Sequence, residues 1–233
     1  MAHCIIVFAK APIPNQVKTR LHPVLSPEQT ASVYEAFLVD WCNALSTIDT
    51  ADLVIAYTPP ESQPTLQALI GEHAIYIPQA GETLGARLIA AAQWASDQGY
   101  TKFLFVGSDS PTLPIEYVKH ALTLLGSRDV VIGPSMDGGY YLIGFSENGV
   151  KLASPTIFEA IAWSTERVFR QTLEKIESVN AQLGLLPPWY DVDTPAELQF
   201  LSDHLLATRL AGKTIPAPRT AHQLHQYRSE PSQ

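Results

Sequence analysis

The stretch Phe103-Leu-Phe-Val-Gly-Ser-Asp-Ser-Pro111 decides the fold class of this chain. Four apolar residues precede a glycine, a single carboxylate and a proline, which is typical of a buried central strand that delivers Asp109 to its carboxyl end. Open α/β sheets bind ligands in the crevice outside the carboxyl ends of their strands. A lone aspartate there is a candidate for holding a metal ion, although Asp, Ser and Pro are also ordinary turn residues.

Short apolar runs and helical periodicity alternate along the rest of the chain. Strands are predicted at residues 4–9, 53–57, 74–77, 130–132 and 140–145. Helices are predicted at about 27–45, 66–70, 115–125, 155–162, 165–181 and 195–207, and a further helix is opened by residues 79–87 and ends at Gly99. This alternation predicts an α/β fold with a mainly parallel sheet.

Three helix starts carry recognisable caps. Ser26 with Gln29, and Thr194 with Glu197, form capping boxes followed by proline at the first helical position; Ser164 is the expected N-cap of the 165–181 helix. We expect one domain over residues 1–210. Residues 211–233 lack apolar periodicity and are expected to be a loosely ordered tail.

Composition narrows the class of protein. The chain has 233 residues, 46% of them hydrophobic and 16% charged, so it is globular. Its net charge of −8 argues against a nucleic-acid partner, which needs a basic face. Cys4 and Cys42 lie within a predicted strand and helix and are expected to be reduced core residues. With no leader-like or long apolar segment, we expect a cytoplasmic protein without a membrane partner.

A cationic loop follows the first predicted strand. Lys10, Lys18 and Arg20 bracket two prolines at the carboxyl end of that strand. Phosphate groups are recognised by such cations together with free backbone N–H groups. The alternative is a solvated surface loop with ordinary cations.

Four aspartates form the acidic counterpart of that loop: Asp109, Asp137, Asp191 and Asp193. One residue separates Asp191 from Asp193, so in an extended segment both side chains face the same way and could hold one cation. Mg²⁺ prefers a few carboxylates plus water and phosphate oxygens. Asp193 could instead be a turn residue, and Asp137, before two glycines, is expected to be structural or to support the site indirectly.

Weaker signals remain, and several catalytic motifs are missing. Small residues in Gly81-Glu-Thr-Leu-Gly-Ala-Arg87 would let a ligand approach the backbone. Trp163-Ser-Thr165 could line an acceptor pocket, although a core tryptophan is as plausible. The sequence has no zinc-ligand spacing, nucleophile elbow, P-loop or dinucleotide fingerprint.

Six segments together carry a family resemblance: residues 9–21, 81–87, 107–111, 137–144, 163–165 and 191–195. They resemble the DUF2064 group of bacterial GT-A-type transferases, often labelled selenodomain-associated or arsenosugar-biosynthesis glycosyltransferases. That group is similar to molybdenum-cofactor nucleotidyltransferases and phospholactate guanylyltransferases. The resemblance spans residues 3–205 and implies a Rossmann-like, three-layer α/β/α nucleotide-diphospho-sugar transferase (GT-A) fold.

The resemblance also implies roles for particular residues. Lys18 and Arg20 would hold phosphates and, with Asp109, serve catalysis. The metal ligands would be Asp109, Asp191 and Asp193, with Mg²⁺ or Mn²⁺ as cofactor. The other expected nucleotide contacts are Ala9, Lys10, Pro12, Gly81, Gly85, Arg87 and Ser108. The expected acceptor contacts are Asp137, Gly138, Gly139, Trp163, Ser164 and Thr165.

Two departures from the family pattern affect these roles. Asn15 stands where a glycine is usual, and asparagine tolerates a left-handed backbone. Thr83 and Ala86 replace acidic residues that are common in the 81–87 segment, which weakens the case for a ligand contact there.

The predicted function is a metal-dependent transferase that uses an activated nucleotide. Glycosyl transfer from a nucleotide-sugar to a small-molecule acceptor is favoured by the family label. The alternatives are nucleotidyl transfer from a nucleoside triphosphate, with release of pyrophosphate, and a non-catalytic nucleotide-binding module. The base, the sugar, the acceptor and the oligomeric state are not specified by these residues.

Overall fold

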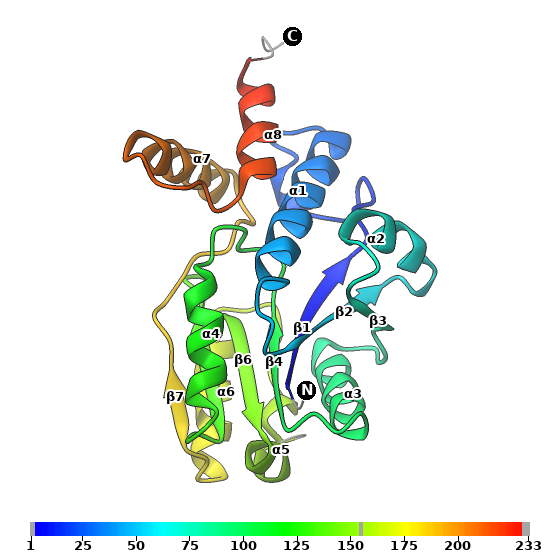
Figure 1. The fold of residues 1–233 in the computed structure, drawn as a ribbon, viewed down its shortest axis with the longest axis vertical. Helices are drawn as coiled ribbons and strands as arrows, with labels where there is room; N and C mark the ends of the chain where they lie inside the picture. Colours follow the sequence, from blue (N-terminus) through cyan, green and yellow to red (C-terminus); the bar gives the residue numbers. More distant parts are fainter. Residues whose placement is uncertain (1–2, 154–155, 230–233) are drawn as a thin grey trace.

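The computed structural model describes residues 3–153 and 156–229 (Figure 1). Seven strands form one sheet in the order β3-β2-β1-β4-β6-β5-β7. The strands are β1 (His3–Lys10), β2 (Asp52–Thr58), β3 (Ile75–Pro78), β4 (Lys102–Val106), β5 (Val130–Pro134), β6 (Tyr140–Ser146) and β7 (Leu183–Leu185). The helices are α1 (Pro27–Leu45), α2 (Gln63–Ile70), α3 (Leu84–Asp97), α4 (Ile115–Leu124), α5 (Glu147–Ala153), α6 (Val168–Ser178), α7 (Pro195–Leu210) and α8 (Pro218–Ser229).

The sheet is mainly parallel, as predicted. Strand β1 pairs in parallel with both β2 and β4, in the register Ile5↔Leu53 and Ile5↔Leu104. Strand β6 is the exception, because it runs antiparallel to β4 on one side and to β5 on the other. The chain turns from β1 toward β2 and β3 on one side and later adds β4 on the other. The crevice between β1 and β4 is therefore the point where the strand order reverses, which is where such sheets bind ligands.

Helices cover both faces of the sheet and give three layers. Alternate residues of β1 point to opposite faces: Ile5 and Val7 join the core under α1, α2, α4, α7 and α8. Cys4 and Ile6 join the core under α3 and α6. Both cysteines are buried and unpaired, as the sequence predicted. Among the described residues, no helix combines the length and apolar character needed to cross a membrane.

The C-terminal tail differs from the sequence expectation, because residues 218–229 form α8 on the side of α1 (Figure 1). The buried carboxylate of Asp40 in α1 accepts hydrogen bonds from the backbone N–H of Arg219 (3.1 Å) and of Thr220 (2.8 Å). Leu224 is buried on the same core. A carboxylate from one helix thus caps the first turn of another, and weak apolar periodicity in 211–233 concealed this contact.

Other elements also departed from prediction. Helix α5 and strand β7 were not predicted. Where a helix over 155–162 was predicted, the structure has a 3₁₀ turn at Thr156–Phe158. Residue 155 lies outside the described residues. Ser164 does not cap α6, because its φ is 63° and the N-cap is Arg167. Both predicted capping boxes are present.

Candidate active site

Lys18 lies at the centre of the candidate site. It follows β1, has a left-handed backbone (φ 47°) and precedes the 3₁₀ turn Thr19–Leu21. Its side chain is 5% exposed, and its Nζ atom lies 2.6 Å from Oδ1 of Asp109 and 2.7 Å from Oδ1 of Asp193. Burial alone would lower the pKa of Lys18, but the two carboxylates outweigh burial and raise it. The ammonium therefore stays charged between two carboxylates.

The loop after β4 presents Asp109 by burying hydroxyl groups on either side of it. Ser108, Ser110 and Thr112 alternate along the loop and are all buried. Ser108 Oγ lies 2.9 Å from the hydroxyl of Tyr34 in α1, and Ser110 Oγ donates to Oδ1 of Asp191. Thr112 Oγ1 lies 2.7 Å from the Tyr190 hydroxyl. Anchored at three positions, the loop leaves the Asp109 side chain 40% exposed.

The segment before α7 brings the last two aspartates to the same place. The buried Val192 donates its N–H to the carbonyl of Asp109 (2.9 Å), which fixes this segment across the end of β4. Glu197 Oε2 accepts from the backbone N–H groups of Asp193 and Thr194, both at 2.8 Å, so the capping box of α7 also orients Asp193. Asp191 and Asp193 consequently lie beside Asp109, although 82 residues or more separate them from it in sequence.

Negative charge exceeds positive charge within the cluster around Lys18. Burial and the nearby carboxylates of Asp109 and Asp137 raise the pKa of Asp191 to about 6, although the hydrogen bond from Ser110 opposes the shift. The cluster thus contains four aspartates and one ammonium group, Lys18. Folding holds these carboxylates together against their mutual repulsion, which favours binding of a cation.

The donor set fits Mg²⁺ or Mn²⁺. Carboxylate oxygens suit these hard cations, and Mg²⁺ is commonly held by one or two carboxylates together with phosphate oxygens and water. Asp109 and Asp193 converge on a single point, which Lys18 Nζ occupies. Within the described ranges, no three acidic, histidine or cysteine side chains are already arranged as a metal site. Metal ligation by Asp109, Asp191 and Asp193 therefore stays a prediction.

The other predicted cations differ in their surroundings. The side chains of Lys10 and Arg20 are exposed and, across residues 3–153 and 156–229, make no hydrogen bond or ion pair. Arg87 is engaged internally: its Nε donates to the carbonyl of Gly81 (3.0 Å) and its Nη1 donates to Gln79 Oε1 (3.1 Å). Gln79 Nε2 in turn donates to the carbonyls of Ala56 (2.8 Å) and Ala9 (3.3 Å).

Arg87 and Gln79 therefore tie the start of α3 to the carboxyl ends of β1 and β2. Pro12 lies partly exposed in the loop after β1. The Ser108 hydroxyl lies 2.9 Å from the Tyr34 hydroxyl, and its contact with nucleotide stays a prediction.

Two predicted segments lie against each other. A Cβ atom on Gly85 would lie 2.6 Å from the carbonyl oxygen of Phe158 and 2.9 Å from Nε1 of Trp163, so Trp163 covers the start of α3. Thr165 Oγ1 donates to the carbonyl of Ala162 (2.7 Å). The 81–87 and 163–165 segments therefore share one surface, and Gly85 is needed for close packing.

The turn after β5 is built by its own aspartate. Asp137 Oδ1 accepts from the backbone N–H of Gly139 (2.9 Å) and from the hydroxyl of Ser135. Gly138 has φ of 89°, and a Cβ there would lie 2.4 Å from the carbonyl oxygen of Glu166. The structural role expected for Asp137 is therefore present, and it lies close enough to raise the pKa of Asp191.

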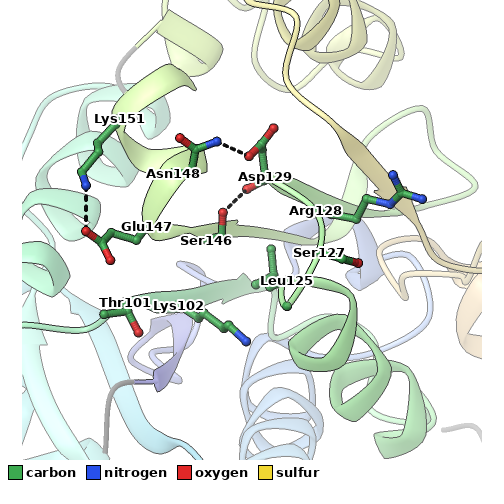
Figure 2. Close-up of a pocket in the computed structure, with 11 residues that line it drawn as sticks. Thr101, Lys102, Leu125, Ser127, Arg128, Asp129, Ser146, Glu147, Asn148 and Lys151 are labelled. Atoms are coloured by element: carbon green, nitrogen blue, oxygen red, sulfur yellow. Dashed lines mark hydrogen bonds and ion pairs between the residues drawn. The ribbon is translucent and has the colours of Figure 1, made fainter.

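A separate pocket lies at the other end of β4. A cavity of about 540 Å³ opens at the amino end of β4, lined by Lys102 and by the ends of β5 and β6 (Figure 2). Its two carboxylates already have partners: Asp129 accepts from Asn148 Nδ2, and Glu147 lies 2.7 Å from Lys151 Nζ. Because Asp109 follows the opposite end of β4, this cavity is separate from the aspartate cluster.

Sequence reasoning missed the residues that support the site. Tyr34 lies among the apolar residues of α1, and none of Tyr34, Ser110, Thr112 and Tyr190 was predicted to support the site. The alternating hydroxyl residues at 108, 110 and 112 are the one signal that could have identified the loop as an anchored one. The partners themselves lie 74 to 81 residues away in sequence.

Comparisons with known proteins agree with this architecture. A crystal structure of a protein from Desulfovibrio desulfuricans G20, provisionally assigned as a nucleotide-diphospho-sugar transferase, is 34% identical, with a TM-score of 0.88 over 98% of this chain and 96% of that one. Rv0371c of Mycobacterium tuberculosis H37Rv, solved in complex with manganese, is 12% identical, with a TM-score of 0.53 over 86% of this chain and 97% of that one. At that identity the likeness concerns the fold alone.

A curated relative shows similarity over part of its length. The 3-phospho-D-glycerate guanylyltransferase of Phenylobacterium zucineum (strain HLK1) is 32% identical over 129 residues, which is 54% of this chain and 59% of that protein. The chain thus aligns with about three fifths of this relative.

The family assignment follows from the remaining comparison. The DUF2064 family, described as "Uncharacterized protein conserved in bacteria (DUF2064)", matches residues 41–165, more than half of the chain. That segment contains β4, the anchored 107–114 loop, Asp109 and the 137–139 turn. The chain therefore belongs to the DUF2064 family.

Proposed function

We propose that this protein is a transferase that acts on an activated nucleotide, and that the reaction is nucleotidyl transfer to a small anionic acceptor. One observation carries the proposal: a buried ammonium, Lys18, lies between Asp109 and Asp193 at the strand-order reversal of an α/β sheet. A polyphosphate substrate can be bound by basic side chains and by a metal ion, and this site has both the basic side chains and carboxylates that could hold the metal. The guanylyltransferase activity of the curated relative supports nucleotidyl over glycosyl transfer.

The roles of the charged residues follow from their positions. Lys10 and Arg20, whose side chains make no internal bond in the described part of the chain, are placed to contact phosphate oxygens. Asp109 and Asp193, with Asp191 beside them, would hold Mg²⁺ or Mn²⁺, which when bound neutralises charge that develops on the leaving group. The nucleoside would lie along the 79–87 turn, and the acceptor along 135–139 and 163–165.

The proposed chemistry is a single displacement. An anionic oxygen of the acceptor forms a bond to the α-phosphorus of a nucleoside triphosphate. The bond from that phosphorus to the bridging oxygen of the β-phosphate breaks, and pyrophosphate leaves with the electron pair. Because an anionic acceptor needs no general base, the residues at this site act by positioning and by neutralising charge.

Glycosyl transfer is the second candidate, favoured by the provisional assignment of the Desulfovibrio protein. In that reaction the acceptor attacks the anomeric carbon and a nucleoside diphosphate leaves. The same cations would neutralise the leaving group. A non-catalytic nucleotide-binding module is less well supported, because such a module has no need for four clustered carboxylates.

One assay separates these candidates. The purified protein is incubated with each of ATP, GTP, CTP and UTP, with Mg²⁺ or Mn²⁺, and with a panel of acceptors that includes 3-phosphoglycerate; released pyrophosphate is measured. In parallel, UDP- and GDP-sugars are tested for release of nucleoside diphosphate. Acceptor-dependent pyrophosphate release from one triphosphate is the expected result, and it should be lost in Asp109→Ala. Diphosphate release from a nucleotide-sugar instead would establish glycosyl transfer.

Binding without turnover is the remaining outcome. A thermal-shift panel with the same nucleotides detects it, because a ligand at about 100 times its dissociation constant adds roughly 2.7 kcal/mol of stability. Stabilisation by a nucleotide with no product under any condition would contradict a transferase and favour the binding module.

A further inference from the structure

One buried hydroxyl joins the two loops that form the site. Tyr34 projects from α1, is 3% exposed, and its hydroxyl oxygen accepts the backbone N–H of Lys10 at 3.1 Å. The same oxygen lies 2.9 Å from Ser108 Oγ. Lys10 ends β1 and opens the cationic loop, and Ser108 immediately precedes Asp109.

The protonation state of Tyr34 suits this bridge. Burial, together with the nearby carboxylate of Asp109, raises the pKa of Tyr34 to about 12. The phenol is therefore neutral near pH 7 and retains its proton. A neutral phenol accepts one hydrogen bond and donates another, which allows it to accept from Lys10 and donate to Ser108 at the same time.

The bridge joins the two loops that supply Lys18 and Asp109. Lys18 comes from the loop after β1, and Asp109 comes from the loop after β4. Strands β1 and β4 are paired only as far as Val7 and Val106, so beyond that point other contacts must set the separation of the two loops. The Tyr34 hydroxyl contacts Lys10, which opens the loop after β1, and Ser108, which precedes Asp109 in the loop after β4.

We infer that Tyr34 is a positioning residue, whose hydroxyl sets the spacing between the cationic loop 10–20 and the acidic loop 107–114. The inference deepens the function proposed above and rests on it for its catalytic consequence. The competing explanation is purely structural: the ring of Tyr34 fills the core under α1, and its hydroxyl merely satisfies two buried polar groups. Tyr34→Phe keeps the ring and removes the bridge, so it separates the two.

A matched control exists in the same core. Tyr57 in β2 is 4% exposed and its hydroxyl donates to Gln63 Oε1 at 2.9 Å, so Tyr57→Phe also removes one buried hydrogen bond from an equally buried ring. Its partner lies in α2, outside both loops. A purely structural role for the Tyr34 hydroxyl predicts that the two variants lose similar stability and that neither lowers kcat.

The first measurement is hydrogen–deuterium exchange of the full chain without ligand. In Tyr34→Phe, amides of residues 10–20 and 107–114 should exchange about fivefold faster than in the wild type, because one stabilising bond has been lost from each loop. Tyr57→Phe should leave both segments unchanged. Equal exchange in the two variants, or faster exchange in only one loop of Tyr34→Phe, would overturn the inference.

The second measurement uses turnover and a double-mutant cycle. Tyr34→Phe should lower kcat about tenfold with little change in KM for the nucleotide, because the loops still bind but seldom reach the reactive geometry. Ser108→Ala should produce a similar loss, and the double variant should add little to either. Additive effects would contradict a shared bridge. If the wild type itself has no turnover, the proposed function fails, while the exchange experiment still decides the role of Tyr34.

Discussion

Replacing Lys18 by methionine removes the charge at the centre of the site while keeping a similar length of side chain. The ammonium lies 2.6 Å from Asp109 and 2.7 Å from Asp193. Removing one partner of a buried ion pair costs about 3–5 kcal/mol, since the remaining charge is left without compensation. Here the side chains of Asp109 and Asp193 are 40% and 36% exposed, so water screens the freed carboxylates. We therefore expect a loss of about 2 kcal/mol, which is below the range for a fully buried pair.

Thermal denaturation measures this loss. For a chain of this size, about 2 kcal/mol corresponds to a fall in Tm of roughly 4–8 °C. Lys119→Met is the matched control, because Lys119 forms an exposed pair with Glu116 at 3.0 Å. An exposed pair of this kind contributes at most about 1 kcal/mol, so the control should shift little.

Added Mn²⁺ then tests what the lysine displaces. In Lys18→Met, Asp109 and Asp193 are free to bind a cation, so Mn²⁺ at about 100 times its dissociation constant should return roughly 2.7 kcal/mol and restore the Tm. In the wild type without nucleotide, the ammonium competes for the same position and Mn²⁺ should stabilise much less. An unchanged Tm in Lys18→Met, or equal stabilisation of both proteins by Mn²⁺, would refute the reasoning.

Three further substitutions test other features of the structure. Burial raises the pKa of Asp191 from 3.8 to about 6, so the folded protein binds the carboxyl proton of Asp191 more tightly than the unfolded chain does. The stability that this proton contributes is present below pH 4 and is lost as the pH rises through 6. Asp191→Asn should therefore be more stable than the wild type at pH 8, by about 3 kcal/mol at most, but not at pH 4; parallel Tm–pH profiles would contradict this. Gly138→Ala should lower Tm by several degrees, because Gly138 has φ of 89° and a Cβ would lie 2.4 Å from the Glu166 carbonyl. Gly212→Ala is the control and should lower Tm less, because Gly212 has φ of 66° and open space around it. Asp40→Ala should cost about 1–2 kcal/mol and expose α8 to limited proteolysis; resistance equal to that of the wild type would show that the cap is dispensable.

The sequence predicted the parts of the fold that depend on local patterns. The apolar run 103–106 identified β4, and the capping boxes at Ser26 and Thr194 identified the starts of α1 and α7. These signals are local because strand burial and helix capping involve residues within a few positions of each other. Helix α8 and strand β7 were not predicted, because each depends on contacts with residues that are distant in sequence. Helix α8 needs Asp40 from α1, and β7 needs its pairing with β5.

The candidate site was predicted as a list of residues but not as an arrangement. Lys18 was expected to contact phosphate, and Asp109 and Asp193 were expected to contact metal; the structure joins all three in one ion-paired cluster. The pairing of Lys18 with Asp193 spans 175 residues, and no local pattern encodes a contact of that length. The role of the Tyr34 hydroxyl was not predicted for the same reason, because its partner Ser108 lies 74 residues away in sequence.

The antiparallel strand β6 also sets how far apart the loops after β4 and β5 begin. Because β6 lies between β4 and β5 and runs the opposite way, the ends of β4 and β5 are separated by two strand spacings, about 10 Å. Asp109 follows β4 and Asp137 follows β5, so the strand between them sets these two aspartates apart. A donor held beside β1 and β4 and an acceptor held beside β5 would meet across this strand without crowding.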